Sequence, residues 1–584
     1  MKRSEISRTI DQLDVDLESI ADLGVKQSLV TLLNLVERLA MENQRLQEEV
    51  KQLREEIRRL KGDPKLPSAP AKTPPRKNIS SEDERKRRRD KSSSVRTSRR
   101  TFKNLTVHEE TICPARKDEL PDDARFMGYD DLVVQDVIVH PHNTRFRRER
   151  YYSARLDRWY LGALPDGYQG EFGPHLKALT IALKYVGNMS EPKVLEFFDT
   201  FGVQISSGTI SNILTHLSEP FEQEKADLYR AGLQSTPFQQ IDDTSATVAG
   251  KRHHTQIVCN PLYTAYFTTP RKDRLTILDV LRDFAPRAFR FNEETERLLC
   301  QLRVAEKVIR QLPGVFARDR DYEQSEIDAL LEPLFPDPNK GQIHRQHILE
   351  AAAIAAYHHQ QDIPLVKVLV CDDAGQFKLL TDALALCWIH EGRHYQKLDP
   401  VVPLHQQKLA GFRDHFWDYY AELAEYRRSP SAERADELAA EFEALFSTVT
   451  GYEALDLRIA KTLAKKESLL TVLSHPEVPL HNNASELGAR VSARRRDVSL
   501  HTKSAAGTRA MDVFTTIVQT AKKLGVSAYQ YLFDRISGQL ELPSLASLIR
   551  ARSHSPPDKR PFPNPASVPT QAHPPIIQNT CASV

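Results

Sequence analysis

The sequence lacks the features that mark secreted and membrane proteins. Among its 584 residues are only six cysteines, which are scattered along the chain and form no CxxC pair. This excludes a disulfide framework and a self-evident zinc site. No apolar run is long enough to cross a membrane, and the opening MKRSEISRTIDQLDVD lacks the apolar segment of a signal peptide. We therefore expect a soluble protein of a reducing compartment, in effect the cytoplasm.

A large net charge is also missing. Lysine and arginine number 81 against 79 aspartates and glutamates, a formal net charge of +2, so no global field points to nucleic acid. Charge is instead local, because residues 63–104 contain a Pro-rich stretch and then the basic run RKNISSEDERKRRRDKSSSVRTSRR. We predict a disordered linker that can lie along phosphates without reading bases, and a solvated tail is the alternative. Residues 541–584, Pro-rich from about Ser553, are predicted to be a disordered tail.

The clearest local pattern is a heptad repeat within residues 1–62. Its d positions are Leu32, Leu39, Leu46, Leu53 and Leu60. Its a positions are Leu29, Val36, Asn43, Val50 and Ile57. Leucine at d with mainly β-branched residues at a favours a parallel two-stranded coiled coil, in which a polar a residue such as Asn43 fixes the register. We predict a leucine-zipper-like coiled coil and hence a homodimer; the alternative is a single amphipathic helix packed on its own chain.

The pattern changes twice in the middle of the chain. Residues 105–165 contain two strand-like runs, DLVVQDVIVH and TRFRRERYYSARLDRWY, and residues 166–232 follow a helical pattern. Within the helical part, Ser206 or Ser207 would cap the second helix of a helix-turn-helix that could read DNA, although a plain helical hairpin is commoner. Residues 233–540 combine three strand-like runs, the first of them FQQIDDTSATV, with a helix, a later buried strand and many further helices, the clearest of them AERADELAAEFEALF. They predict an α/β domain with helical insertions near 288–362 and 396–475.

Acidic residues mark the strand ends of this α/β segment. Asp242 and Asp243 lie in the first strand-like run, and Asp372 and Asp373 end the later strand. A further acid, Glu486, lies at a helix start near the C-terminus. Carboxylates that gather repel one another unless a cation is bound, and such oxygen ligands suit Mg²⁺. Two ions can stabilise both oxygens of an in-line phosphoryl displacement, and the order strand Asp, strand Asp, helix Glu is that of RNase H-like nucleases and transposases.

The helix-start acid also has a simpler explanation. In HNNASELGAR, Asn483 would cap the helix and Glu486 would complete a capping box at the third helical position. Arg490 would then pair with Glu486 one turn later. These residues alone leave open whether Glu486 is a cap or takes part in chemistry.

Four motifs resemble, in order, those of the insertion-sequence-66 family of transposases. They are IDDTSATVAGK, VLVCDDAGQF, CWIHEGRHY and HNNASELGAR, and the resemblance extends from residue 29 to about 540. It implies an α/β fold with an RNase H-like catalytic core and helical insertions, preceded by an N-terminal coiled coil and a mainly helical DNA-binding region. It also implies a DDE-type transposase of a bacterial insertion sequence, which hydrolyses phosphodiesters at transposon ends and transfers the strands to target DNA.

The resemblance also assigns roles to individual residues. It implies that Asp242, Asp372 and Glu486 are the catalytic and metal-binding acids, with Asp243 and Asp373 as less favoured neighbours. Two Mg²⁺ ions are implied, for which Mn²⁺ can substitute. The accessory positions that match the motifs are His390, Arg393, Asn482 and Asn483. The candidates for DNA binding are Arg490 and the basic residues that follow it, Arg494, Arg495, Arg496 and Lys503.

The sequence departs from the family in its cysteines. Many relatives carry a four-cysteine zinc element before the helical region, and here only Cys113 stands near that place. We therefore interpret residues 105–165 as a degenerate zinc-binding-like region and expect no structural zinc. A competing zinc site would use Cys387, His390 and His394, which are spaced for one face of a helix but lack an evident fourth ligand.

The expected partners follow from the same resemblance. They are transposon-end and target DNA, a second copy of the chain through the coiled coil, and small accessory proteins of the same element, with no membrane. The alternative from another class is a dimeric DNA-binding protein that descends from a transposase and no longer cuts. The intact acids argue against it, because a non-catalytic relative is free to lose one. A coiled-coil interaction scaffold would leave the acid motifs unexplained.

Overall fold

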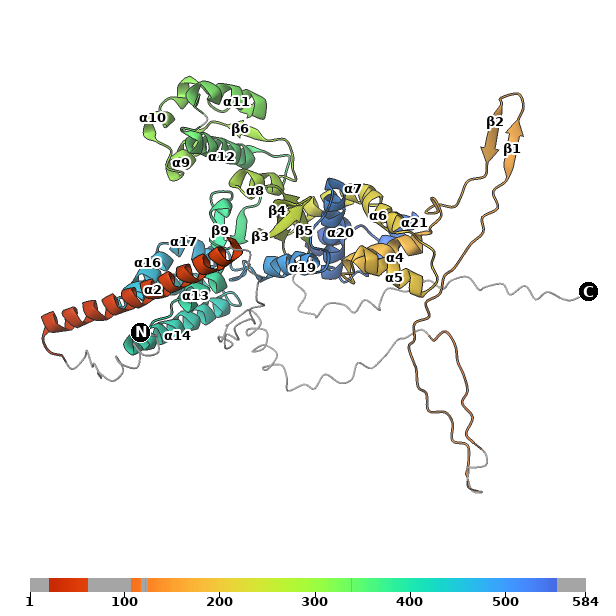
Figure 1. Ribbon diagram of the computed structural model, residues 1–584, viewed down its shortest axis with the longest axis horizontal. Coiled ribbons are helices and arrows are strands. Elements are labelled where there is room, and N and C mark those ends of the chain that lie inside the picture. Colours follow the sequence, from red (N-terminus) through yellow and green to blue (C-terminus); the bar gives the residue numbers. More distant parts are fainter. Residues whose placement is uncertain (1–19, 61–106, 117–120, 122–123, 338, 554–584) are drawn as a thin grey trace, which may run out of the picture. The chain divides into compact units, whose positions relative to one another are not determined.

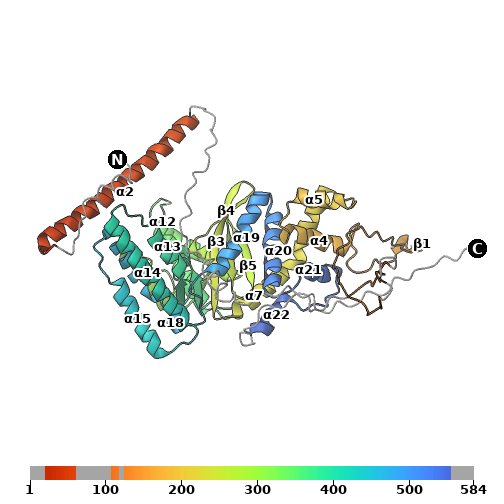
Figure 2. The same ribbon diagram turned by 90° about the horizontal axis from the view of Figure 1, so that it is seen from below.

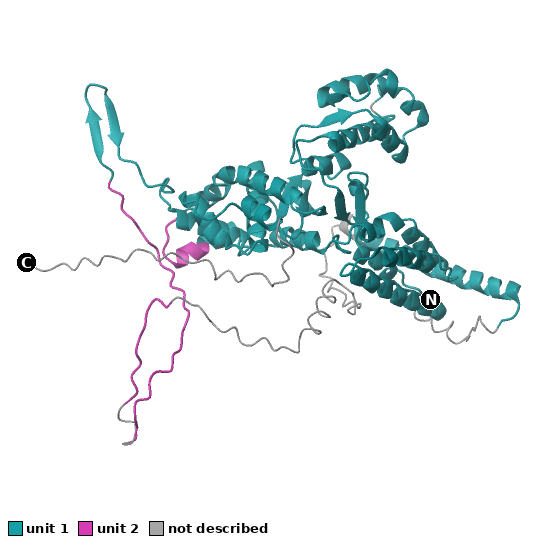
Figure 3. Cartoon of the chain, turned by 180° about the vertical axis from the view of Figure 1, so that it is seen from behind, with its two compact units in different colours: residues 1–69, 148–195, 206–584 teal, residues 70–147, 196–205 magenta. Residues whose placement is uncertain are grey.

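The structure, a computed structural model, describes residues 20–60, 107–116, 121, 124–337 and 339–553. The chain divides into two units, which Figure 3 colours separately: 1–69 with 148–195 and 206–584, and 70–147 with 196–205. The predicted linker at 63–104 lies outside the described residues. None of the described helices has the length and apolarity needed to cross a bilayer.

The larger unit contains a five-stranded mixed sheet with the strand order β5-β4-β3-β8-β9 (Figure 1). Its strands are β3 (Phe238–Val248), β4 (Lys251–Cys259), β5 (Thr264–Thr269), β8 (Val368–Cys371) and β9 (Ala383–Leu386). The first three form an antiparallel meander, and β8 and β9 run parallel to β3. All four residues of β8 are buried, as its continuous apolar sequence predicts. The α/β class predicted from the sequence is confirmed.

One edge of the sheet is closed by a helix rather than by another strand. Helix α20 (Ala505–Lys523) lies along the edge strand β5 (Figure 2). Three of its side chains, one turn apart, accept hydrogen bonds from outward-facing backbone N–H groups of β5. The acceptors Asp512, Thr516 and Thr520 receive the N–H groups of Thr268, Tyr266 and Thr264 at 2.7, 3.0 and 3.2 Å. This spacing of four residues satisfies an edge that would otherwise be open to pairing.

Two helical segments interrupt the sheet in the chain order. Before β8 come α8 (Arg274–Leu281), α9 (Glu293–Gln301), α10 (Glu306–Ile309), α11 (Gln324–Leu331) and α12 (Gln342–His359). After β9 and α13 (Trp388–Gln396) come α14 (Pro403–Tyr426), α15 (Ala432–Phe446), α16 (Glu453–Leu463), α17 (Lys466–Leu469) and α18 (Thr471–Ser474). The first segment also holds a two-stranded antiparallel sheet, β6 (Ala288–Arg290) with β7 (Asp321–Glu323), which the helical prediction missed.

The remaining helices flank the α/β part in sequence. They are α4 (Pro174–Tyr185), α5 (Glu191–Thr200), α6 (Ser207–His216), α7 (Ser218–Gln234), α19 (Asn483–Ser499), α21 (Ala528–Ser537) and α22 (Leu545–Ser553). Ser206 caps α6 by accepting from the N–H of Thr209 at 3.1 Å. Helix α22 packs on α7 and buries Leu545 and Ile549. The prediction that disorder begins at residue 541 is therefore wrong for residues up to 553, where apolar side chains find a surface to cover.

The heptad region forms one long helix, α2 (Leu23–Leu60). Its first half is held on the larger unit by the face that carries Leu33 and Glu37. The buried Glu37 carboxylate accepts from the N–H groups of Val401 at 2.8 Å and Val402 at 2.7 Å, where α14 begins. Leu29, the first a residue of the heptad pattern, packs against this same cluster. The d leucines Leu32, Leu39, Leu46 and Leu53 are about half exposed, with 54% for Leu32. The coiled coil stays a prediction, and the exposed part of its seam begins after Leu29.

In the described residues of the region predicted to be rich in strands, the structure has a single hairpin. Strand β1 (Arg150–Ser153) pairs antiparallel with β2 (Arg158–Leu161). The other predicted strand, DLVVQDVIVH, is irregular and its apolar side chains are exposed, with 86% for Leu132 and 83% for Ile138. The prediction fails there because an alternating apolar sequence becomes a strand only where another strand supplies hydrogen bonds.

Candidate active site

Strand register brings the first two acids together. In the parallel pair of β3 and β8, Gln240 lies opposite Val370. Asp242 and Asp372 each stand two residues further along, so Asp372, just past the carboxyl end of β8, lies beside Asp242 in the middle of β3. Carboxyl ends of parallel strands form one edge of a sheet, where ligands commonly bind.

Side-chain alternation separates each acid from its acidic neighbour. Asp243 points to the opposite face from Asp242 and contacts Lys272 Nζ at 3.0 Å, Gln376 Nε2 at 3.3 Å and His254 Nδ1 at 3.7 Å. Within the described part of the chain, no lysine or arginine forms an ion pair with Asp242. The first acid thus lacks the basic partner that its neighbour has.

The second acidic pair behaves in the same way. Asp373 forms ion pairs with Lys378 and Lys465, both at 2.6 Å. Burial tends to raise the pKa of Asp373, but hydrogen bonds from the two ammonium groups outweigh it and lower the pKa. Asp372 instead accepts only the backbone N–H of Ala374, at 3.1 Å, among the described contacts. Lys272, Lys378 and Lys465 were not predicted as partners of these acids. The fold brings Lys272 and Lys465 to them from other segments, and Lys378, close after Asp373 in sequence, follows no pattern that marks an ion pair.

The third acid is carried to the same edge by α19. Asn482, which is 1% exposed, donates through Nδ2 to the carbonyl oxygen of Ile241 at 2.6 Å and so ties the start of the helix to β3. Two turns on, Gly488 lets the helix approach β4, because a Cβ there would stand 2.8 Å from Ile257 Cγ2. Figure 2 shows α19 beside the meander strands. Only a residue without a side chain fits this crossing.

The capping-box prediction for this helix is wrong. Helix α19 begins at Asn483, so Asn482 is the residue before it, and no side chain caps the helix. The Asn482 side-chain amide donates to the carbonyl oxygen of Ile241 instead. Glu486 therefore sits one position later than a capping box requires, and its carboxylate contacts α13. Arg490 is exposed and forms no ion pair with Glu486 among the described contacts.

The pKa of Asp242 depends on the other acids near it. Burial is the main cause that raises the pKa of Asp242, to about 7, and a hydrogen bond from the N–H of Asp243 opposes it. The negative charges of Asp372, Asp243 and Glu486 raise this pKa further. The acids of β8 and α19 thus act on the partly buried carboxylate of β3, although in the described residues the three acids do not have ligand atoms within 4.8 Å of one another. Oxygen ligands of this kind, with no basic partner for Asp242, suit a divalent cation such as Mg²⁺.

Glu486 is held loosely by two residues of α13. His390 Nδ1 lies 3.6 Å from Glu486 Oε1, and Arg393 Nη2 lies 3.5 Å from Oε2. Arg393 also lies 2.9 Å from His390 Nε2. Because a guanidinium can only donate, His390 Nε2 accepts and its proton is on Nδ1, which faces Glu486. Burial and the charge of Arg393 lower the pKa of His390, so the imidazole is neutral near pH 7.

The competing zinc site takes a different form from the one predicted. Cys387, His390 and Glu486 have ligand atoms within 4.8 Å of one another, whereas His394 is not part of this group. Burial raises the pKa of the Cys387 thiol to about 11, so the sulfur is protonated near neutral pH. The guanidinium of Arg393 also opposes a cation here. The cluster favours a neutral thiol beside the acids over a closed structural zinc site.

The predicted DNA-binding residues fall into two groups. Arg490, Arg494 and Lys503 are exposed. Arg495 is only 7% exposed; it donates to the carbonyl oxygen of Tyr185 at 2.8 Å and to Thr515 Oγ1. The prediction that Arg495 contacts DNA is therefore wrong, because its guanidinium is buried and forms hydrogen bonds within the protein.

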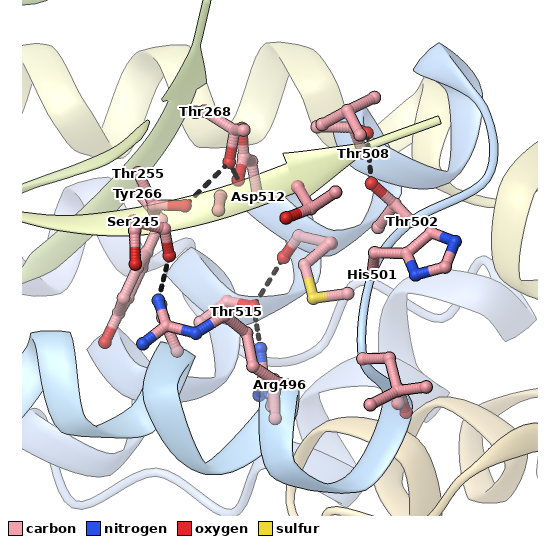
Figure 4. Close-up of a pocket in the computed structure, with 18 residues that line it drawn as sticks. Ser245, Thr255, Tyr266, Thr268, Arg496, His501, Thr502, Thr508, Asp512 and Thr515 are labelled. Carbon is pink, nitrogen blue, oxygen red and sulfur yellow. Dashed lines mark hydrogen bonds between the residues drawn. The ribbon is translucent and has the colours of Figure 1, made fainter. Parts of the chain in front are cut away.

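Arg496 lies at a pocket that continues the site along β3. It donates to Thr244 Oγ1 at 2.9 Å and to the carbonyl oxygen of Ser245. Figure 4 shows Arg496 and Ser245 among the residues that line a pocket formed by β3, β4, β5, α19 and α20. Serine and threonine make up half of its lining, and its volume is about 60 Å³. Thr244 shares the face of Asp242, two residues away. Arg496 thus holds β3 against α19 next to the acids.

Comparison with known proteins agrees with this geometry. The model of the transposase IS66 family matches residues 337–510, a segment that includes Asp372 and Glu486. The uncharacterized protein y4jO of Sinorhizobium fredii (strain NBRC 101917 / NGR234) is 33% identical over 332 residues, which cover 56% of this chain and 100% of that protein. The chain therefore belongs to the IS66 family of transposases.

Proposed function

We propose that this protein is a DDE-type DNA transposase with an RNase H-like core, which cuts DNA at the ends of its insertion sequence and joins them to target DNA. One observation carries the proposal: Asp242, Asp372 and Glu486 come from two neighbouring strands and a helix, and the charges of Asp372 and Glu486 help to raise the pKa of Asp242. An antiparallel meander extended by parallel strands, with one acid on β3 and another just past the end of β8, supports the RNase H-like assignment.

The proposed cofactors are two Mg²⁺ ions held by these three acids, with Mn²⁺ as a substitute. When bound, such ions neutralise the carboxylates and stabilise the charge on the attacking and leaving oxygens of an in-line displacement. Lys272 forms an ion pair with Asp243, and Lys465 forms one with Asp373. Only one acid of each pair, Asp242 or Asp372, is therefore left to face the substrate. Loose contacts to Glu486 leave that carboxylate able to change partner.

The proposed reaction has two phosphoryl transfers. In the first, water attacks a phosphodiester at the element's end, and the bond to the 3′ oxygen breaks to release a 3′-hydroxyl. In the second, this hydroxyl attacks a phosphodiester of target DNA and expels its 3′ oxygen. The exposed Arg490, Arg494 and Lys503 are placed along α19 and just past its end to meet DNA phosphates.

We also propose that the protein acts as a homodimer through the exposed heptad seam of α2. Leu29 is used in the contacts that hold α2 to its own chain, whereas Leu39, Leu46 and Leu53 further along the helix are exposed and open to a partner. Small accessory proteins of the element remain expected partners.

The test is a Mg²⁺-dependent cleavage and strand-transfer assay on the element's own end sequences. Asp242→Asn and Glu486→Gln should each slow cleavage about a hundredfold or more, since a loss of about 3 kcal/mol in the transition state has that effect. The matched control is Asp243→Asn, one residue away on the opposite face, which should retain most activity. If folded Asp242→Asn and Glu486→Gln retain full activity, this triad is wrong. A wild type that binds the ends and never cuts with any divalent metal would favour a non-catalytic DNA-binding protein.

A further inference from the structure

The hairpin of β1 and β2 presents both of its faces to solvent. Cross-strand register pairs Arg150 with Leu161 and Tyr152 with Trp159 on one face. The opposite face carries Tyr151, Tyr160 and Arg158. The large side chains are strongly exposed, with 64% for Tyr151, 51% for Trp159 and 53% for Leu161. A two-stranded hairpin is marginal in water without a surface to pack on, so these exposed side chains indicate a partner.

The charge on the hairpin identifies the chemistry of that partner. Residues 148–162 contain four arginines, Arg148, Arg150, Arg155 and Arg158, and two acids, Glu149 and Asp157. Both acids accept hydrogen bonds from tyrosine hydroxyls: Tyr151 donates to Glu149 at 3.0 Å, and Tyr152 donates to Asp157 at 2.7 Å. Among the described residues no carboxylate forms an ion pair with any of the four guanidinium groups. The hairpin therefore presents positive charge that the fold leaves uncompensated.

Aromatic rings hold the strand arginines on the two faces. The Arg150 guanidinium lies 3.9 Å from the centre of the Trp159 ring on one face. On the other, Arg158 lies 5.6 Å from the centre of the Tyr160 ring. Stacking of this kind orders a guanidinium and leaves its N–H groups free to donate in the ring plane. Such groups match phosphate oxygens.

We propose that the β1–β2 hairpin is a DNA-binding arm that enters the major groove of duplex DNA. A two-stranded ribbon fits this groove, and arginines on both faces would meet the phosphates of both walls. Arg155, in the turn between the strands, stands where the arm would reach deepest. The arm occupies the region where the sequence has lost its zinc-binding cysteines, and it offers a metal-free means of binding the transposon end.

This inference rests on the proposed function for the identity of the DNA, and its test separates the two. Full-length protein is titrated with a labelled duplex of the element's end, a duplex of shuffled sequence and a single strand, over a series of salt concentrations. The double variant Arg150→Gln with Arg158→Gln should bind both duplexes more weakly. Its plot of log affinity against log salt concentration should be shallower by about 2, as for two lost phosphate contacts.

Two further variants keep the test sharp. Arg155→Gln touches no strand contact and should reduce the salt slope by about 1 without unfolding the hairpin. The matched control is Arg297→Gln with Arg310→Gln, an equal charge change at exposed arginines that pair with Glu294 and Glu306. It should leave the slope unchanged.

The outcomes separate the arm from the catalytic proposal. An unchanged slope in the double variant and in Arg155→Gln overturns the arm, and the proposed function still stands if the wild type cuts. Weaker binding of the single strand alone also overturns it. If the wild type binds no DNA, both proposals fail. A reduced slope in the arm variants with unchanged cleavage of saturating DNA supports the arm as a binding element separate from the acids.

Discussion

Replacing Asp242 by asparagine should stabilise the metal-free protein while it abolishes activity. The Asp242 pKa rises from 3.8 to about 7 in the folded protein, mainly through burial. Between these two pH values the unfolded chain has lost a proton that the folded chain keeps, so stability falls as pH rises. The loss is about 1.4 kcal/mol for each pH unit and about 4 kcal/mol once the pH exceeds 7. Asparagine has nearly the same shape and carries no charge, so it removes this loss.

The assay is urea unfolding of wild type and Asp242→Asn in excess EDTA at several pH values. We expect the variant to be more stable than the wild type by about 4 kcal/mol near pH 8. Near pH 5 this difference in stability should be smaller by about 3 kcal/mol than it is near pH 8. Added Mg²⁺ should stabilise the wild type near pH 8, by about 2.7 kcal/mol at a hundred times its dissociation constant. The variant should gain much less.

The control is Asp243→Asn, which removes an equal charge one residue away. Asp243 is paired with Lys272 at 3.0 Å, so its loss should bring no stability at alkaline pH. If Asp242→Asn and the wild type differ by the same amount at every pH, Asp242 is not the buried acid of a cation site. A stabilisation by Mg²⁺ that survives in Asp242→Asn would place the cation elsewhere.

Four further substitutions test other parts of the structure. Arg495→Ala should lower the free energy of unfolding, measured with urea, by about 3 kcal/mol and leave the salt dependence of DNA binding unchanged. Arg494→Ala should lower the free energy of unfolding by less than about 0.5 kcal/mol and reduce the salt dependence of DNA binding. The reverse pattern would restore Arg495 as a DNA contact. Gly488→Ala should lower the free energy of unfolding by about 1–3 kcal/mol, because the new Cβ would meet Ile257 Cγ2 at 2.8 Å. Cleavage of DNA should also fall, because Glu486 moves with the helix. A variant as stable as the wild type would show that α19 can shift freely. Glu37→Ala should speed hydrogen exchange in the first half of α2, since the buried acid accepts two backbone N–H groups there; unchanged exchange would mean that apolar contacts alone hold the helix.

Sequence patterns predicted the elements whose side chains carry their own signal. The run FQQIDDTSATV is β3 residue for residue, and AERADELAAEFEALF is α15. In both, local propensity and the apolar pattern agree with the final environment. DLVVQDVIVH has equal propensity and fails, because a strand also needs a neighbour and that neighbour is not encoded in the run itself.

The candidate site was predictable as a set of residue types and not as a set of contacts. Motif order selected Asp242 over Asp243 only by resemblance, whereas the structure separates them by which face of β3 they occupy. Lys272, which holds Asp243, lies in a segment that has no pattern to connect it with the acids. The burial of Arg495 had no local signal either, because its partners Tyr185 and Thr515 lie far away in sequence.

Glu486 shows why local and functional explanations of the same residue must be separated by geometry. A capping glutamate returns to the backbone of its own helix, and it needs the asparagine before the helix to cap as well. Here the Asn482 amide is bound to β3, so the cap is absent and α19 begins where the sheet holds it. The Glu486 carboxylate then extends toward α13, within reach of His390 and Arg393, and its charge is felt at Asp242. Asn482, the residue at the cap position, thus ties α19 to β3 and delivers Glu486 to the acids, and Asn482→Ala should weaken Mg²⁺ binding even though the side chain touches no cation. An unchanged Mg²⁺ affinity in that variant would mean that packing of Gly488 on β4 suffices to place the helix.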